Sequence, residues 1–185
     1  MLLNNKELRI LKEFAGDYSF KNYGRKLASK LNMNQKTVSN ILNTLEKENI
    51  LKFTQEGKNK YYYLNRLNPY IKDIIKFLEI NKKIDFLEKH KKINTLFLEI
   101  EKRSKGIISV FGSYASFSET KTSDLDLFVI GDIQEVKDLE RMYNIKLNIV
   151  KLDKNKFKYK DNFINEIIQN HVIIKGIEEY IELIW

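Results

Sequence analysis

The 185-residue sequence contains no cysteine and only two histidines, His90 and His171. The missing thiols exclude disulfide bonds and thiolate metal sites, and two histidines are too few for a histidine-rich zinc site. If the protein uses a catalytic metal ion, oxygen ligands must therefore hold it.

Long apolar runs are missing as well. No run approaches the ~18 residues that a membrane-spanning helix needs, and the first residues, MLLNNKELRILKEF, carry an acid where a signal peptide would be purely apolar. We therefore expect a soluble, cytoplasmic protein. Proline is scarce too, and the single one, Pro69, marks the clearest break in the sequence pattern.

The formal net charge is +8, and it is unevenly distributed. Residues 1–70 hold 13 Lys and Arg against 6 Asp and Glu, whereas residues 105–185 hold 11 against 13. A basic excess in the N-terminal part indicates contact with nucleic acid there. A general bias of the proteome towards Lys, Asn and Ile would give the same excess without such a function.

Three helices followed by a hairpin are predicted for residues 5–66. Apolar residues at helical spacing predict the helices, of which the first ends at Gly16, and a polar turn at 32–34 separates the last two. A strand, a turn at Gly57 and an aromatic-rich return strand then predict a hairpin. This succession resembles the winged helix-turn-helix of prokaryotic transcription regulators.

In that family the third helix lies in the major groove and the hairpin contacts the DNA backbone or minor groove. The resemblance therefore implies DNA contacts from polar side chains that suit base edges and phosphates. These are Gln35, Lys36, Thr37, Ser39, Asn40 and Asn43 on the helix and Lys58 and Lys60 on the hairpin. Double-stranded DNA is the expected partner, although winged helices also serve as protein-interaction domains.

Residues 69–104 predict a helical connector, made of one or two amphipathic helices with an interruption near Asn81. Its apolar stripe can pack on the following domain or on a second copy of the chain. Because helix-turn-helix proteins commonly bind two half-sites, a homodimer is one expectation. Packing within a single chain explains the same stripe.

The C-terminal part, 105–185, alternates strand and helix signals, which predicts a small mixed sheet covered by helices. The apolar run 107–111 leads directly into Gly112 and Ser113, and a second run, 125–130, ends before a glycine. A Gly-Ser pair where a strand turns into a helix offers backbone N–H groups and a hydroxyl to phosphate.

Asp124 and Asp126 stand two residues apart at the entry to the second strand, so both side chains leave the same side of the backbone. Two carboxylates so close repel each other, and a shared cation removes that cost. Mg²⁺ prefers one or two carboxylates together with water and substrate phosphates. The pair therefore predicts a magnesium site that acts on a phosphorylated substrate.

The stretch GSYASFSETKTSDLDL, with its Gly-Ser and its Asp-x-Asp, resembles the signature of the DNA-polymerase-β-like nucleotidyltransferase superfamily, and of its minimal branch in particular. The resemblance covers residues 105–175. It implies transfer of a nucleoside monophosphate from a nucleoside triphosphate, which we expect to be ATP, to a hydroxyl. Asp124 and Asp126 would bind Mg²⁺, or Mn²⁺ in its place, and Gly112, Ser113 and Ser123 would contact the nucleotide.

Two positions depart from the pattern of that superfamily. Phe117 stands where many members have glycine, and Asn148 stands on the third strand where a third carboxylate is usual. An amide oxygen binds metal weakly and cannot act as an anionic base. Asp153, five residues later, would have to replace it from beyond the strand end.

The sequence thus predicts an α+β protein in three parts: a winged helix-turn-helix in residues 1–68, a helical connector in 69–104 and a nucleotidyltransferase-like domain in 105–185. Two functions stay open. The first is a metal-dependent nucleotidyltransferase with a DNA-binding domain, whose acceptor is a hydroxyl of a protein or of a small molecule. The resemblance implies a HEPN-type toxin as one such protein. The second is a DNA-binding regulator whose degenerate transferase domain binds nucleotide or mediates assembly.

Overall fold

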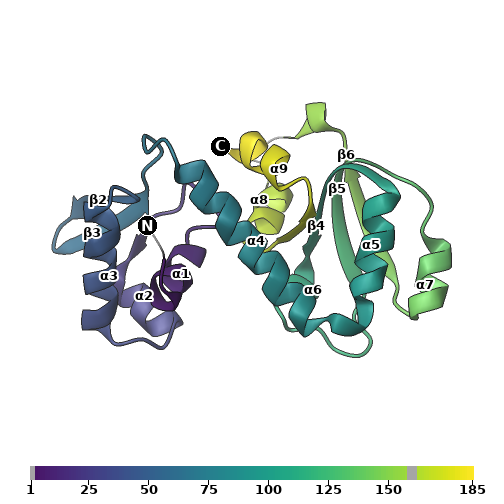
Figure 1. The fold of residues 1–185 in the computed structure, drawn as a ribbon, viewed down its shortest axis with the longest axis horizontal. Coiled ribbons are helices and arrows are strands. Elements are labelled where there is room, and N and C mark those ends of the chain that lie inside the picture. Colours follow the sequence, from purple (N-terminus) through teal and green to yellow (C-terminus); the bar gives the residue numbers. More distant parts are fainter. Residues whose placement is uncertain (1–2, 158–161) are drawn as a thin grey trace. The chain divides into compact units, whose positions relative to one another are not determined.

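The computed structural model describes residues 3–157 and 162–185 and has the expected mixture of α and β structure (Figure 1). The chain divides into two compact units, Met1–Leu78 and Glu79–Trp185. None of the helices within the described ranges combines the length and the apolar character that a membrane span requires.

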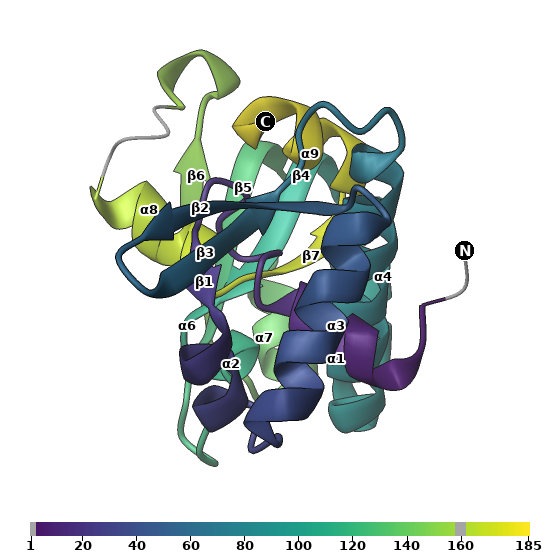
Figure 2. The ribbon, with the colours of Figure 1, turned by 90° about the vertical axis from the view of Figure 1, so that its left-hand side faces the viewer.

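The first unit contains three helices and a small antiparallel sheet in the order β1-β3-β2. The helices are α1 (Asn5–Lys12), α2 (Gly24–Lys30) and α3 (Gln35–Lys47), and the strands are β1 (Asn22–Tyr23), β2 (Leu51–Glu56) and β3 (Asn59–Leu64). The β2–β3 hairpin projects past the helices, and α2 and α3 lie on the same side of it (Figure 2).

Helix α1 ends earlier than the sequence indicated, at Lys12 and not at Gly16. Beyond it, Phe14 N donates to Leu11 O and Ala15 N donates to Lys12 O, which is the hydrogen-bond spacing of tight turns. Phe14 and Ala15 are buried although they lie after the regular helix. Because these apolar residues continue the helical spacing, the sequence indicated a helix longer than the one formed.

Asn34 determines where α3 begins. Its side chain accepts hydrogen bonds from Lys36 N at 2.8 Å and from Thr37 N at 3.4 Å, and so satisfies two free donors of the first turn. The buried face of the helix carries Val38 and Leu42, so the polar residues between them face outward.

The predicted interruption near Asn81 is wrong. Helix α4 (Ile71–Lys89) continues through this residue and breaks at His90, before a 3-10 turn (Lys91–Ile93) and α5 (Asn94–Lys102). A single Asn costs a helix only a fraction of a kcal/mol, about 0.5, so the apolar pattern on both sides outweighs it.

The second unit is built on a four-stranded sheet in the order β6-β5-β4-β7. Strands β5 and β6 are parallel, whereas β4 runs antiparallel to both β5 and β7. The strands are β4 (Ser104–Phe111), β5 (Leu125–Ile133), β6 (Leu147–Leu152) and β7 (Val172–Lys175). The remaining elements are α6 (Gly112–Ala115), α7 (Lys137–Tyr143), a 3-10 turn (Lys154–Lys156), α8 (Asn162–Gln169) and α9 (Ile177–Ile184).

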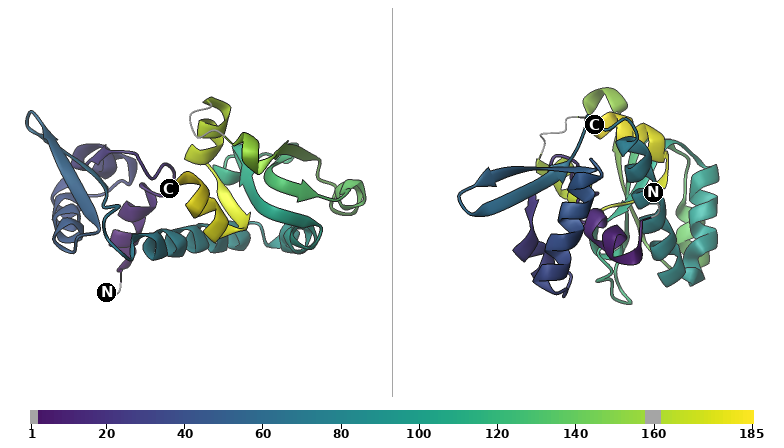
Figure 3. Two further views of the ribbon diagram at one scale, coloured as in Figure 1. Left: turned by 90° about the horizontal axis from the view of Figure 1, so that it is seen from above. Right: turned by 60° about the vertical axis from the view of Figure 1, so that its left-hand side comes forward.

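Helices cover both faces of this sheet, with α5 on one side and α8 on the other (Figure 3). A buried cluster joins Phe97 and Ile100 of α5 to Val110 of β4 and to Leu125 and Leu127 of β5. Side chains alternate between the faces of a strand, so Asp126 points away from this cluster. The segment 69–104 therefore contributes α5 to the core of the second unit.

Strand β5 extends three residues beyond the predicted apolar run, through Gly131 to Ile133. Gly131 lies opposite Gly106 of β4, and both have positive φ, 132° and 92°. A Cβ at either position would overlap a carbonyl oxygen of the other strand. The glycine that ended the apolar run therefore permits a close pairing of the two strands instead of ending β5.

Two lysines fasten the edge strand β7. Lys175 Nζ donates to the backbone oxygens of Glu101 and Ser104, both at 2.7 Å. Lys83 Nζ binds Glu101 Oε1 at 2.8 Å and also donates to Ile174 O. Because both ammonium groups are half-buried, these bonds satisfy donors that water reaches poorly.

A buried ionisable cluster lies where α4, α8 and α9 meet. Glu79 and His171 have no exposed side-chain surface, and Glu79 Oε2 lies 3.4 Å from His171 Nε2 and 2.9 Å from Lys82 Nζ. Burial lowers the pKa of His171, and the Lys82 ammonium lowers it further. Burial alone would raise the pKa of Glu79, but Lys82 and His171 together hold it below its ordinary value.

Phe117 follows α6 in the loop that leads to β5, and its backbone has φ +59°. This is the left-handed conformation that favours glycine, so the loop keeps a glycine-type backbone although a phenylalanine stands there. Its ring stacks on His90, with centroids 5.9 Å apart, and the Lys89 ammonium lies 4.5 Å from the ring centroid. These contacts offset the backbone strain.

We expect Phe117→Gly to be more stable than Phe117→Ala by about 1 kcal/mol. Both variants lose the ring and its contacts, so their difference isolates the cost of a Cβ at positive φ. The free energy of unfolding in urea measures it. An alanine variant as stable as the glycine variant would contradict the left-handed backbone.

Acidification should destabilise the second unit through His171 and Glu79. Folding lowers the pKa of both groups. The unfolded pKa values are about 6.5 for His171 and about 4.3 for Glu79. The stability that each group contributes is therefore fully present above its unfolded pKa, and it is lost as the pH falls below that value towards the folded pKa. From pH 7 to pH 5 the free energy of unfolding should fall, by up to about 1.4 kcal/mol per pH unit for one proton. In His171→Gln this slope should be shallower in urea titrations, and an unchanged slope would exclude His171 as its source.

Candidate functional site

The two acids of the Asp-x-Asp motif lie at the mouth of β5. Asp124 precedes the strand directly and Asp126 is its second residue, while Leu125 between them is buried in the core. Alternation along the strand therefore directs both carboxylates to the opposite face, where they are half-buried. The structure brings the two acids together as their spacing indicated.

Gly112 allows Asp126 to approach the turn between β4 and α6. Its φ is +67°, and a Cβ there would overlap Asp126 Oδ2. Phe111, the last residue of β4, is the cross-strand partner of Asp126, so the carboxylate and the turn lie side by side. Ser113 is half-buried and follows Gly112 directly. The Gly-Ser pair and the acids thus form one site, in which the positive φ and the close approach of Asp126 both favour glycine at position 112.

Asp124 and Asp126 each accept a hydrogen bond from the neighbouring segment, Asp124 from Lys146 directly before β6 and Asp126 from Asn148 within it. Lys146 Nζ lies 2.9 Å from Asp124 Oδ2, and Asn148 Nδ2 lies 3.2 Å from Asp126 Oδ1. The hydrogen bond to Asp124 raises the pKa of Lys146 above its ordinary value. The local charge is therefore partly balanced by protein groups.

Asn148 lies directly beside Asp126 in the parallel pairing of β5 and β6. This is the position at which a third carboxylate was expected, and the residue there is an amide. Asp153 does not take its place, because its carboxylate accepts a hydrogen bond from Asn155 N at 3.1 Å and begins the 3-10 turn beyond β6.

The donors present fit one hard divalent cation. Two carboxylates and an amide oxygen suit Mg²⁺ or Mn²⁺, which complete their shells with water and phosphate. Among residues 3–157 and 162–185, no group of three or more His, Cys, Asp or Glu side chains could hold a metal ion. Asp124 and Asp126 are the carboxylates that would hold it.

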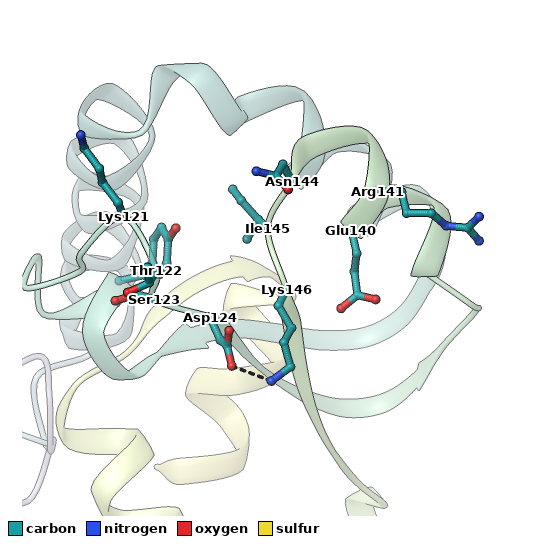
Figure 4. Close-up of a pocket in the computed structure, with 10 residues that line it drawn as sticks. Lys121, Thr122, Ser123, Asp124, Glu140, Arg141, Asn144, Ile145 and Lys146 are labelled. Atoms are coloured by element: carbon teal, nitrogen blue, oxygen red, sulfur yellow. Dashed lines mark hydrogen bonds and ion pairs between the residues drawn. The ribbon is translucent and has the colours of Figure 1, made fainter.

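A pocket of about 430 Å³ opens beside Asp124 (Figure 4). Ser123 lines it, but the Ser123 hydroxyl accepts a hydrogen bond from Thr120 N at 2.9 Å and so stabilises the turn before Asp124. Glu140 lines the opposite side and accepts from Leu147 N at 2.8 Å. The other lining residues are Tyr114, Lys121, Thr122, Arg141, Asn144, Ile145 and Lys146.

Sequence reasoning missed Lys146 and Glu140. Strand alternation in the sequence places Lys146 on the same face as Asn148, two residues later, but no motif marks Lys146 as part of the site. No sequence signal marks Glu140, because its position depends on how α7 packs against β6.

The residues expected to bind DNA lie on the outward surface of α3 and on the hairpin. Half of them line one pocket of about 210 Å³ in the first unit: Gln35, Ser39, Lys58 and Lys60. Lys36, Asn40 and Asn43 are exposed and Thr37 is half-buried. Asn43 also accepts a hydrogen bond from the Tyr62 hydroxyl at 3.1 Å, which ties α3 to β3.

Comparison with known proteins gives a family and one distant structural match. The model of the nucleotidyltransferase domain matches residues 90–184, just over half of the chain. No curated protein matches significantly. A solved structure described as "Crystal structure of the toxin-antitoxin with AMP-PNP" matches with 17% sequence identity and a TM-score of 0.37, over 56% of this chain and 78% of that chain. On the extent of the domain match, the chain belongs to the nucleotidyltransferase domain family.

Proposed function

We propose that the second unit transfers a nucleoside monophosphate from ATP to a hydroxyl acceptor with the help of Mg²⁺. One observation carries this proposal: Asp126 packs against Gly112 so closely that a Cβ there would overlap Asp126 Oδ2. A paired acid held against a Gly-Ser turn brings a cation site and a phosphate site into contact. Family membership supports the same reaction class.

Each residue has a distinct task in this reaction. Asp124 and Asp126 hold the cation, while Gly112 and Ser113 hold the triphosphate beside it. When bound, the cation would stabilise charge on the attacking and leaving oxygens. Ser123 acts indirectly, because its hydroxyl shapes the turn that presents Asp124.

The transfer step needs no side-chain base. The acceptor oxygen forms a bond to the α-phosphorus, the bond from that phosphorus to the oxygen bridging to the β-phosphate breaks, and pyrophosphate leaves. The hydroxyl proton passes to water, because the side chain beside Asp126 is the amide of Asn148, which cannot accept it. We therefore infer a slow transferase, suited to a regulatory modification. The acceptor that we propose is a protein hydroxyl, as on a HEPN-type toxin.

We propose that residues 1–68 form a winged helix-turn-helix that binds double-stranded DNA, as a homodimer on two half-sites. The support is the three helices with a following hairpin, and the shared pocket of Gln35, Ser39, Lys58 and Lys60. Amide and hydroxyl groups suit base edges and phosphates, and lysines suit phosphates. Asn43 then acts mainly by fixing α3 to the hairpin through Tyr62.

A second candidate function is a DNA-binding regulator without turnover. Asn148 favours it, because the site offers no third carboxylate at that position. In that case the transferase domain would bind nucleotide as a signal, and the reaction would be absent with every acceptor.

Mg²⁺-dependent nucleotide binding tests the acid pair. Titration calorimetry with α,β-methylene ATP, in which the bond to be broken is blocked, should show binding in Mg²⁺ and at least about tenfold weaker binding in EDTA. We expect Asp126→Ala to remove the Mg²⁺ dependence.

Asp132→Ala is the matched control. Asp132 lies on the same strand, about 20 Å from Asp126 at the spacing of a β-strand, and it pairs with Lys151. This variant should bind like the wild type. Equal binding by Asp126→Ala and Asp132→Ala would contradict the metal assignment, and pyrophosphate release with an acceptor would separate the enzyme from the regulator.

DNA binding should depend strongly on salt and on Lys36. Fluorescence anisotropy with a 20-base-pair duplex should show affinity falling at least about tenfold between 50 and 200 mM KCl. Lys36→Ala should weaken binding several-fold and reduce the salt slope by about one. Lys47, also exposed but in the last turn of α3, provides the control, and Lys47→Ala should bind normally. Equal losses in both variants would indicate a nonspecific effect of net charge.

A further inference from the structure

The mouth of β5 and β6 combines two acids with a lysine and an amide. Parallel pairing places Leu125 beside Leu147 and Asp126 beside Asn148, and Leu125 N donates to Lys146 O at 2.8 Å. Because side chains alternate along a strand, Lys146 shares the face of Asn148. The backbone register therefore places Lys146 next to Asp124, within reach of its exposed side chain.

The charges on this face limit what it can bind. Two carboxylates and one ammonium leave a formal charge of −1, and the Lys146 ammonium lies 2.9 Å from Asp124 Oδ2. Within the described ranges, no third acid joins the pair to form a metal-binding group. The triphosphate would add negative charge and oxygen ligands of its own, but two divalent cations would have to share the two carboxylates and would both lie near the Lys146 ammonium. The protein ligands at this face therefore favour one cation.

We propose that the site uses a single divalent cation and that the Lys146 ammonium supplies the second positive charge, against the phosphate oxygens of the nucleotide. This inference rests on the proposed function and specifies its metal count and a further substrate-binding residue. Transfer with two cations places one on the attacking and one on the leaving oxygen. Here a lysine provides one of those charges.

Lys146 has the freedom that this task requires. Its side chain is 68% exposed, so it can turn from Asp124 towards a ligand without leaving a packed environment. An ammonium carries three donors, so it can contact Asp124 and a phosphate oxygen at the same time. Its flexible stem allows that adjustment. As a consequence, Lys146 competes with the cation for Asp124 before nucleotide binds, and cooperates with it afterwards.

The test counts bound Mn²⁺ by electron paramagnetic resonance, with α,β-methylene ATP and the full chain in excess over nucleotide. We expect one Mn²⁺ per nucleotide complex in the wild type. Lys146→Met keeps the length of the stem and removes the charge. It should bind Mn²⁺ about fivefold more tightly without nucleotide and bind the nucleotide about fivefold more weakly in Mn²⁺.

Two further variants make the result specific. Lys151→Met removes a lysine of β6, the strand that follows Lys146. Lys151 also pairs with an acid of β5, Asp132, at 2.9 Å, and its substitution should leave both affinities unchanged. Asn148→Asp places a third carboxylate beside Asp126 and should raise the count to two Mn²⁺ per complex.

The outcomes separate this inference from the proposed function. Two Mn²⁺ per wild-type complex, or unchanged affinities in Lys146→Met, would overturn the single-cation site while nucleotide binding stands. No nucleotide-dependent Mn²⁺ in the wild type would overturn both. The wild-type count requires no variant, so it decides the metal number even if a substitution impairs folding.

Discussion

The contact between Asp126 and the backbone of Gly112 is the constraint on which the site of the second unit depends. In the antiparallel register of β4 and β5, Phe111 lies opposite Asp126. The turn that follows Phe111, which begins at Gly112, therefore lies beside the carboxylate. The missing Cβ of Gly112 provides the space for it. One antiparallel ladder thus positions the Gly-Ser turn beside Asp126.

The parallel ladder on the other side of β5 supplies the electrostatic environment. It carries Lys146 and Asn148 where the superfamily pattern implied a carboxylate, so the acids face donors from the adjacent strand. In the free protein, the attraction of the Lys146 ammonium for the two carboxylates offsets the repulsion between them. The same ammonium would oppose a cation at this face, so a stable free state and a high affinity for a cation place opposite demands on Lys146.

Local patterns in the sequence were sufficient for the fold class and for placing Asp124 and Asp126 on one face, because apolar runs and two-residue spacing are short-range signals. That the Gly-Ser pair joins the acids in one site was expected from the resemblance to the superfamily. Local patterns were insufficient where the pairing of distant segments determines the length of a strand or the contacts of a side chain. The extension of β5 through Gly131 requires Gly106 opposite it, 25 residues earlier in the sequence. The contact of Lys146 with Asp124 requires the register of β5 and β6, which no local motif specifies. Asn81 remained helical because packing outweighs a small intrinsic preference.

The lysines that fasten β7 bear on which basic groups a polyanion can touch. Lys83 and Lys175 direct their ammonium groups at backbone oxygens and at Glu101, inside the second unit. Both charges still count in the net charge of the unit and in its long-range field. A phosphate could bind either ammonium directly only if the bonds that fasten β7 were given up, so direct contacts with a polyanion fall to other basic side chains.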